Sequence, residues 1–173
     1  RLAGFMPAAA IESCVVQIDL NQPYRTTDYV CLDAAVGARP VVAVGESIHV
    51  TREMPLVRQR IVRYLHEQKG FNVLALEGSL MDAWTAQEHV YANGNPGAAA
   101  AHLFTREALF GLWQTAPMEA VVAEALKPPS GAPPIYLASF DIQPGMSRAY
   151  GGSLQQSFGP FLAALSALEP NCG

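Results

Sequence analysis

The stretch Pro40-Val-Val-Ala-Val-Gly-Glu-Ser-Ile-His-Val-Thr-Arg-Glu53, with the run that follows it to Glu77, decides the fold. Residues 40–44 form a short valine-rich run closed by a glycine, and residues 72–76 form a second apolar run. Each has the length and composition of a buried strand in a parallel sheet. The residues between them predict one helix that ends at Gly70, so we expect a right-handed strand–helix–strand unit.

The predicted helix has clear start signals and one charged residue on its apolar side. Thr51 is a candidate N-cap, Glu53 places a negative charge in the first turn, and Pro55 is tolerated so close to the start. Arg58 falls within the apolar stripe, and burying it unpaired would cost several kcal/mol, so it needs a carboxylate. Alternatively its stem packs on the stripe while its head reaches water. The stripe, at about 100° per residue, contains Met54, Val57, Ile61, Tyr64 and Leu65.

Ionisable side chains follow the carboxyl ends of the predicted strands. Glu46 and His49 lie in the loop after the first strand, and Glu77 ends the second. Residues 135–140 predict a third strand that ends at Asp141, although this residue could equally cap a turn. Ligands of open α/β sheets bind at this edge, so we expect a site there.

Helices flank these strands, which makes the predicted fold class α/β, a parallel sheet with flanking helices. Residues 1–32, with a possible strand at 14–18, are expected to cross the domain as a strap, and residues 33–173 to form a single domain. The ending near Pro170 suggests an incomplete version of a larger fold. The predicted helices cover residues 32–36, 79–91, 103–126 with interruptions at Gly111 and Pro117, and 154–168.

Composition excludes two classes of partner. The 173 residues carry a formal net charge of −4 with dispersed lysines and arginines, which provides no basic face for nucleic acid and no polybasic membrane anchor. No apolar run reaches the roughly 18 residues of a membrane span. Because the chain begins at Arg1, we expect a segment to precede it, such as a signal peptide.

The three cysteines leave two compartments open. Cys14, Cys31 and Cys172 have no metal-binding spacing, and an odd number cannot all pair within one chain. A disulfide between the first two would indicate export, whereas three buried thiols would fit the cytoplasm. Export is slightly favoured.

Several separated motifs occur in a fixed order along about residues 33–145. They are Gly45-Glu-Ser-Ile-His49, Thr51-Arg-Glu53, Arg58, Arg63-Tyr-Leu65, Gly70-Phe71, Ala75-Leu-Glu77, Asp82-Ala-Trp84, Leu112-Trp-Gln-Thr115 and Phe140-Asp-Ile-Gln143. Together they resemble the N-terminal core of the erythromycin esterase-like family. The resemblance implies an α/β core in which a histidine acts as general base on a water that attacks a macrolide lactone ester. The matching functional positions are Glu46, His49, Arg58 and Glu77.

The chain also departs from that family. Val50 replaces a glycine after the motif histidine, Gln114 replaces an arginine, and Ser139-Phe140 replaces a glycine segment. Family members are longer, and their C-terminal half brings a further functional histidine, so pairing with a missing C-terminal half is expected. In the family the Trp113 segment lines the cleft, whereas a large aromatic on a helix more often fills a core.

The residues themselves favour water as the nucleophile. No Gly-x-Ser-x-Gly elbow is present, and no cysteine follows a strand near His49. Histidine titrates near neutral pH, and Glu46 or Glu77 could fix its tautomer. Arg58 would hold the remaining carboxylate or stabilise the oxyanion. Together with the family resemblance, which implies the ester or lactone substrate and a cleft wall at Trp113, this predicts a hydrolase of a small-molecule ester or lactone with Trp113 and Asp141 contacting the substrate.

Two other functions use the same residues. Glu46, His49, Glu77 and Asp141 form an oxygen-rich set that suits Mn²⁺ or Mg²⁺, although Arg58 would place a positive charge beside the ion. We predict no cofactor, with a divalent metal as the alternative. The third hypothesis is a non-catalytic module that binds a small anionic or hydrophobic ligand or pairs with another chain.

Overall fold

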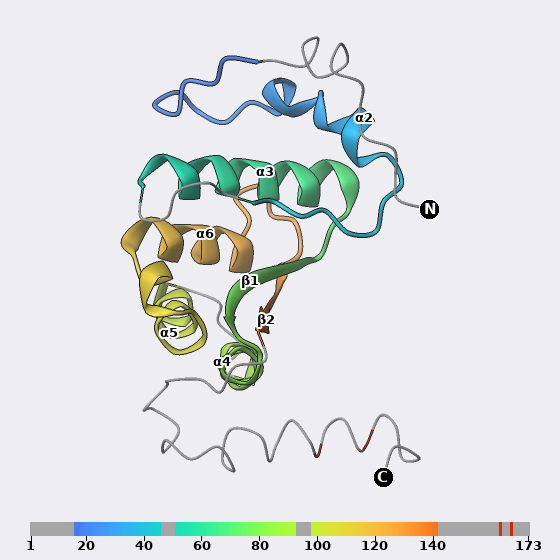
Figure 1. The fold of residues 1–173 in the computed structure, drawn as a ribbon. Coiled ribbons are helices and arrows are strands. Elements are labelled where there is room, and N and C mark those ends of the chain that lie inside the picture. Colours follow the sequence, from blue (N-terminus) through green and yellow to red (C-terminus); the bar gives the residue numbers. More distant parts are fainter. Residues whose placement is uncertain (1–15, 46–50, 93–97, 142–162, 164–166, 168–173) are drawn as a thin grey trace.

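A computed structural model describes residues 16–45, 51–92 and 98–141, together with positions 163 and 167 (Figure 1). Within these ranges the chain forms a two-stranded parallel sheet flanked by helices, so the predicted α/β class is confirmed. The elements are η1 (Thr26–Tyr29), α2 (Leu32–Val36), α3 (Glu53–Lys69), β1 (Val73–Ser79), α4 (Leu80–Ala92), α5 (Ala98–Ala108), η2 (Gly111–Trp113), α6 (Ala116–Leu126) and β2 (Tyr136–Asp141).

The sheet pairs two strands that are far apart in the sequence. β1 and β2 run parallel, with Val73 opposite Tyr136 and Leu76 opposite Ser139, and the register shifts before Ser79 meets Asp141. The connection between them contains α4, α5, η2 and α6, as parallel pairing requires a long crossover. The predicted strands at 72–76 and 135–140 are therefore confirmed.

The predicted strand at residues 40–44 is wrong. In the part of the chain that the structure describes, this segment has no ladder partner, and Val41 is 76% exposed. It runs beside α3 and then lines a cavity in front of β1 (Figure 1). A β-branched run forms a strand only where a neighbouring strand lies within hydrogen-bonding distance.

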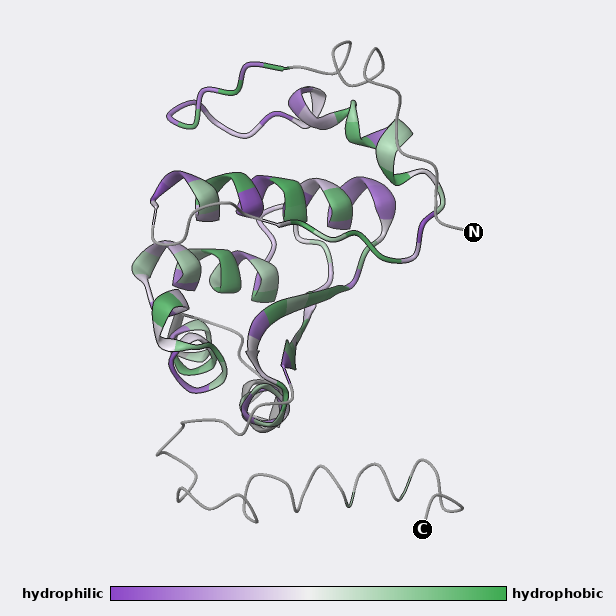
Figure 2. Ribbon diagram, viewed as in Figure 1, coloured by the Kyte–Doolittle hydropathy of each residue, from purple (hydrophilic) through white to green (hydrophobic). Residues whose placement is uncertain are grey.

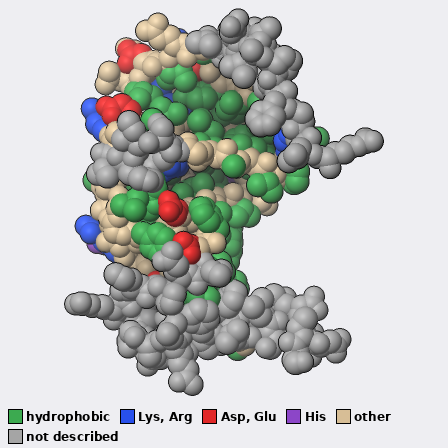
Figure 3. Space-filling model, in the orientation of Figure 1, with side chains coloured by type: hydrophobic (Ala, Val, Ile, Leu, Met, Phe, Trp, Pro, Cys, Tyr) green, Lys and Arg blue, Asp and Glu red, His purple; other side chains and the backbone are tan. Residues whose placement is uncertain are grey.

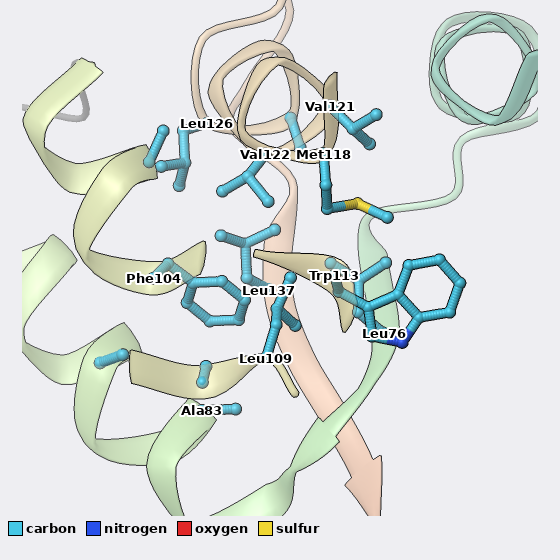
Figure 4. Packing of buried hydrophobic residues seen from close by; sticks show 14 of the residues in the cluster. Leu76, Ala83, Phe104, Leu109, Trp113, Met118, Val121, Val122, Leu126 and Leu137 are labelled. Carbon is cyan, nitrogen blue, oxygen red and sulfur yellow. The ribbon is translucent and has the colours of Figure 1, made fainter. Parts of the chain in front are cut away.

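One face of the sheet packs on the main hydrophobic core. Leu76 of β1 and Leu137 of β2 join Phe104, Met118 and Val122 from the crossover helices, and all five are buried (Figure 4). The opposite face is open: Val73 is 54% and Phe140 63% exposed. The expectation of strands buried on both faces is thus wrong for the described residues, because every crossover helix packs on the same face or end of this short sheet.

α3 ends as its sequence predicts, but its N-cap position is occupied by Arg52 and not by the predicted Thr51. The Thr51 hydroxyl accepts a hydrogen bond from the Met54 N–H (3.4 Å), and Glu53 lies in the first turn. Gly70 ends the helix with φ 74°, and the N–H of Phe71 reaches back to the Leu65 carbonyl (3.2 Å). The helix therefore carries Arg58 at a fixed position along the sheet.

The junction of β1 and α4 depends on Gly78. The strand runs through this glycine to Ser79, whereas the sequence predicted that the strand would stop at Glu77. A Cβ at Gly78 would lie 2.3 Å from the Ala108 carbonyl oxygen, and Gly78 bridges to Leu109. Ser79 then accepts a hydrogen bond from the Asp82 N–H (3.2 Å), as expected of an N-cap.

The helix predicted over residues 103–126 is two helices separated by the η2 turn. The interruption at Gly111 is confirmed, since η2 begins there. The interruption at Pro117 is wrong, because this proline lies in the first turn of α6, where its missing N–H costs nothing. Thr115 caps α6 by accepting from the Met118 N–H (3.4 Å).

Residues 16–36 lie across the outer side of α3 (Figure 1). Arg60 donates to the carbonyl oxygens of Asp19, Leu20 and Gln22, and the Tyr64 hydroxyl donates to Asp33 Oδ1 (2.8 Å). Residues 16–18 form no strand, and α2 matches the predicted short helix at 32–36. The division into a strap at 1–32 and a domain at 33–173 stays a prediction.

Some sequence predictions concern residues that the structure does not describe. These are Cys14 and Val15, the loop 46–50, and most of the helix expected at 154–168. Cys31 is disulfide-bonded, while Cys14 and Cys172 lie outside the described ranges. A disulfide is typical of oxidising compartments, but export stays a prediction. Within the described ranges, no helix is both long and apolar enough to cross a membrane.

Replacing Gly78 with alanine should lower the free energy of unfolding by about 1–3 kcal/mol, because the new Cβ collides with the Ala108 carbonyl. Gly111→Ala is the matched control, since nothing lies within 4 Å of its Cβ position. Urea unfolding monitored by circular dichroism measures both. Equal midpoints for the two variants would contradict the close approach.

The attachment of α2 to α3 should weaken in acid. The Tyr64 hydroxyl and then Lys69 hold the pKa of Asp33 below its ordinary value, and burial raises the pKa of Tyr64 to about 12, so its hydroxyl stays a donor. A carboxyl group whose pKa is lowered by folding stabilises the folded state at any pH above its ordinary pKa, about 3.9. This stabilisation is lost as the pH falls through the pKa of the folded state. Wild type should therefore exceed Asp33→Asn in thermal stability at neutral pH.

That difference should shrink as the pH is lowered below about 4. Tyr64→Phe should reduce the pH dependence, because it removes the main cause of the Asp33 shift. A difference between wild type and Asp33→Asn that is independent of pH would contradict the assignment.

Candidate functional site

A cavity of about 560 Å³ lies between α3, the edge of β1 and the segment 40–45. Its walls are mostly hydrophobic, and hydrophobic side chains gather over the middle of the face shown in Figure 3. Figure 2 shows the same character along much of β1 and along the segment beside α3. The volume is in the range of pockets that bind small molecules.

Arg58 and Trp113 meet in the wall of this cavity. The Arg58 guanidinium carbon lies 5.0 Å from the centre of the Trp113 ring, within the range of a cation–π interaction. Arg58 is half-buried on α3, and Trp113 is 6% exposed. The apolar stripe of α3 therefore turns its single arginine toward the cavity, as the sequence indicated.

Trp113 belongs to both the core and the cavity. Its ring packs beside Leu76 and Met118 in the buried cluster and also lines the cavity (Figure 4). The Gln114 side chain holds the η2 turn by donating to the carbonyl oxygens of Arg106 (2.9 Å) and Leu109 (3.0 Å). The two interpretations of this tryptophan, core aromatic and cleft wall, are therefore compatible.

The two described carboxylates of the predicted site occupy different places. Glu77 is exposed on β1 and lines the cavity together with Arg58. Asp141 is half-buried at the end of β2, opposite Ser79, and is not among the residues that line the cavity. The structure thus brings Arg58, Glu77 and Trp113 to one cavity.

Glu46 and His49 lie in the loop 46–50, outside the described residues. The residue before this loop, Gly45, lines the cavity, and the described chain resumes at Thr51. The residue before the loop is therefore part of the cavity wall. Their positions relative to Glu77 stay a prediction.

Sequence reasoning missed most of the apolar walls. Val62, Met118 and Ile135 line the cavity although they come from α3, α6 and the segment before β2. Only Val62 had a usable signal, since it lies next to the apolar stripe of its helix. The others reach the cavity through tertiary packing, which periodicity does not reveal.

A metal site would need several ligating side chains close together. Among the described residues, no three or more His, Cys, Asp or Glu residues are grouped so that they could hold an ion. Two of the four proposed ligands, Glu46 and His49, lie outside those residues. The metal hypothesis is therefore untested.

Comparison with known proteins shows a distant similarity to a hydrolase. The chain is 24% identical over 112 residues to the Bacillus subtilis (strain 168) protein named "Putative hydrolase YbfO". The match covers 65% of this chain and 24% of that protein, so the chain spans about a quarter of its relative's length. No family model matches the chain, and no solved structure matches it.

Replacing Trp113 with alanine should lower the free energy of unfolding by about 3–5 kcal/mol, because it removes a large side chain from the core. Leu112→Ala is the matched control: its side chain is 40% exposed in the same turn, and its effect should stay within about 0.5 kcal/mol. Urea unfolding distinguishes them. Similar losses in both variants would contradict the packing of Trp113.

Proposed function

We propose that this chain carries the N-terminal part of a hydrolase site that cleaves an ester or lactone by direct attack of water. One observation supports it most. Gly45, Arg58 and Glu77 line the same apolar cavity, and Gly45 is followed in the sequence by the loop that carries Glu46 and His49. The distant similarity to a hydrolase supports the reaction class. The resemblance to the erythromycin esterase-like family supports a macrolactone among the candidate substrates.

In this proposal, His49 is the general base. Its imidazole takes a proton from water as the water oxygen bonds to the ester carbonyl carbon, which leaves a negative charge on the carbonyl oxygen. When the intermediate collapses, the bond to the alcohol oxygen breaks, and the imidazolium returns the proton to the leaving alcohol. Glu46 or Glu77 would fix the tautomer of His49 and stabilise its charged form.

Arg58 would stabilise the oxyanion or hold the second carboxylate. Its position over the Trp113 ring restrains a long, flexible side chain in a cavity wall, where a fixed charge acts most strongly on developing charge. Trp113 would contact the apolar part of the substrate. Asp141, at the end of β2, would bind a polar group at the rim.

Attack of water on the ester with His49 as general base needs no metal. We propose that the chain acts on a small molecule without a cofactor. We also propose that a C-terminal half, in a longer gene product, would complete the site. A divalent ion bound through Glu46, His49, Glu77 and Asp141 is the competing mechanism. A chelator distinguishes the two mechanisms, because it should inactivate a metal-dependent hydrolase and leave a metal-free hydrolase active.

The test is hydrolysis of p-nitrophenyl esters and of erythromycin by this chain and by the longer product of its gene, where there is one. His49→Gln should lower kcat at least about 100-fold, since general-base catalysis contributes that much or more. His102→Gln is the matched control, because His102 is exposed on α5 and pairs with Glu119 (3.1 Å) away from the cavity.

Mass spectrometry of the protein, quenched during turnover, distinguishes direct attack from a covalent mechanism, because both routes place an oxygen from water in the acid product. Direct attack should leave no acyl-enzyme. Equal rates for His49→Gln and His102→Gln, or a trapped acyl-enzyme, would overturn the proposal.

A further inference from the structure

One edge of β1 lacks a neighbouring strand in the described part of the chain. The Tyr136 N–H donates to the Asn72 carbonyl (2.8 Å), and Val73 stands opposite Tyr136. In a parallel ladder, alternate residues turn their backbone groups toward the same neighbour. Leu74 and Leu76 therefore face β2, whereas Val73 and Ala75 direct their N–H and C=O groups to the other side.

That other side is the cavity. Residues 73–77 line it, and so do Pro40, Val41, Val42, Val44 and Gly45. Among the described residues, no backbone hydrogen bond joins the segment 40–45 to Val73 or Ala75. Within the described residues, the N–H and C=O groups of Val73 and Ala75 on this side of β1 therefore have no backbone partner.

The space has the dimensions of a short strand. At about 3.3 Å per residue, the edge from Val73 to Glu77 is about 13 Å long, enough for roughly four residues of an added strand. The volume of about 560 Å³ suits a ligand of that size. Side chains of an added strand would meet apolar walls, from Val42 on one side and Leu109 and Met118 on the other.

The charge of the edge favours a basic ligand. Glu77 is exposed at the carboxyl end of this edge and lines the cavity. Arg58 lies on the α3 wall, over the Trp113 ring, and the whole chain has a formal net charge of −4. Because Arg58 also lines the cavity, a positive group on the ligand would be favoured only at the Glu77 end of the edge, where it would meet a carboxylate.

We propose that this cavity binds an extended apolar peptide segment that carries a basic residue and pairs with Val73 and Ala75 as an added strand. This mode of recognition takes its affinity from backbone hydrogen bonds and its specificity from alternate side chains. It goes beyond the proposed hydrolysis and does not depend on it, because binding requires neither His49 nor a scissile bond.

Hydrogen exchange of single amides tests the pairing. The probe is the blocked peptide acetyl-Lys-Val-Ala-Val-Lys-amide, and the readout is two-dimensional NMR of the labelled chain with and without it. The amides of Val73 and Ala75 should exchange rapidly in the free protein and at least about tenfold more slowly with saturating peptide. The amides of Leu74 and Leu76, which already pair with β2, should change little and serve as the internal control.

Two matched peptides distinguish backbone pairing from non-specific hydrophobic binding. Methylating alternate amide nitrogens of the peptide on the paired side should weaken binding at least about tenfold, since two hydrogen bonds are lost. Replacing both lysines with glutamates should also weaken binding, and Glu77→Gln should reduce the difference between the lysine and glutamate probes.

Three results would overturn the inference. The first is slow exchange of Val73 and Ala75 without peptide, which would mean that the chain itself occupies the edge. The second is equal affinity of the methylated and unmethylated probes. The third is binding that leaves the exchange of Val73 and Ala75 unchanged. Because no ester is cleaved, these results are independent of whether the chain is a hydrolase.

Discussion

The parallel pairing of β1 with β2 is the constraint on which the rest of the structure depends. Parallel strands cannot be joined by a tight turn, so the chain must leave the end of β1 and return to the start of β2. All of α4, α5, η2 and α6 lie in that return. Their apolar residues meet Leu76 and Leu137 and form the main core, which also places Trp113 against the sheet.

Much of this architecture could be predicted from local signals. The strands near 72–76 and 135–140, the end of α3 at Gly70 and the cap at Ser79 each follow from a few neighbouring residues. The valine run at 40–44 was predicted incorrectly, because composition cannot show whether a partner strand is available. Likewise, the open face of the sheet reflects where the crossover helices pack rather than any pattern in the strands.

The candidate site shows the same division. Arg58 could be assigned to the sheet side of α3 because one arginine interrupts an apolar stripe, and Glu77 could be placed on the second predicted strand, although β1 continues past it to Ser79. The contact between Arg58 and Trp113 could not be predicted, since it joins two elements 55 positions apart through tertiary packing. The apolar walls from α6 and from the segment before β2 depend on the same packing.

The attachment of residues 19–22 to Arg60 has a consequence for sequence variation. The arginine binds main-chain oxygens there, and every amino acid supplies that atom. Substitutions in this short stretch should consequently be tolerated over evolution, whereas position 60 should stay an arginine. A relative could thus look unalignable in this region and still fasten its N-terminal crossing to the helix in the same way.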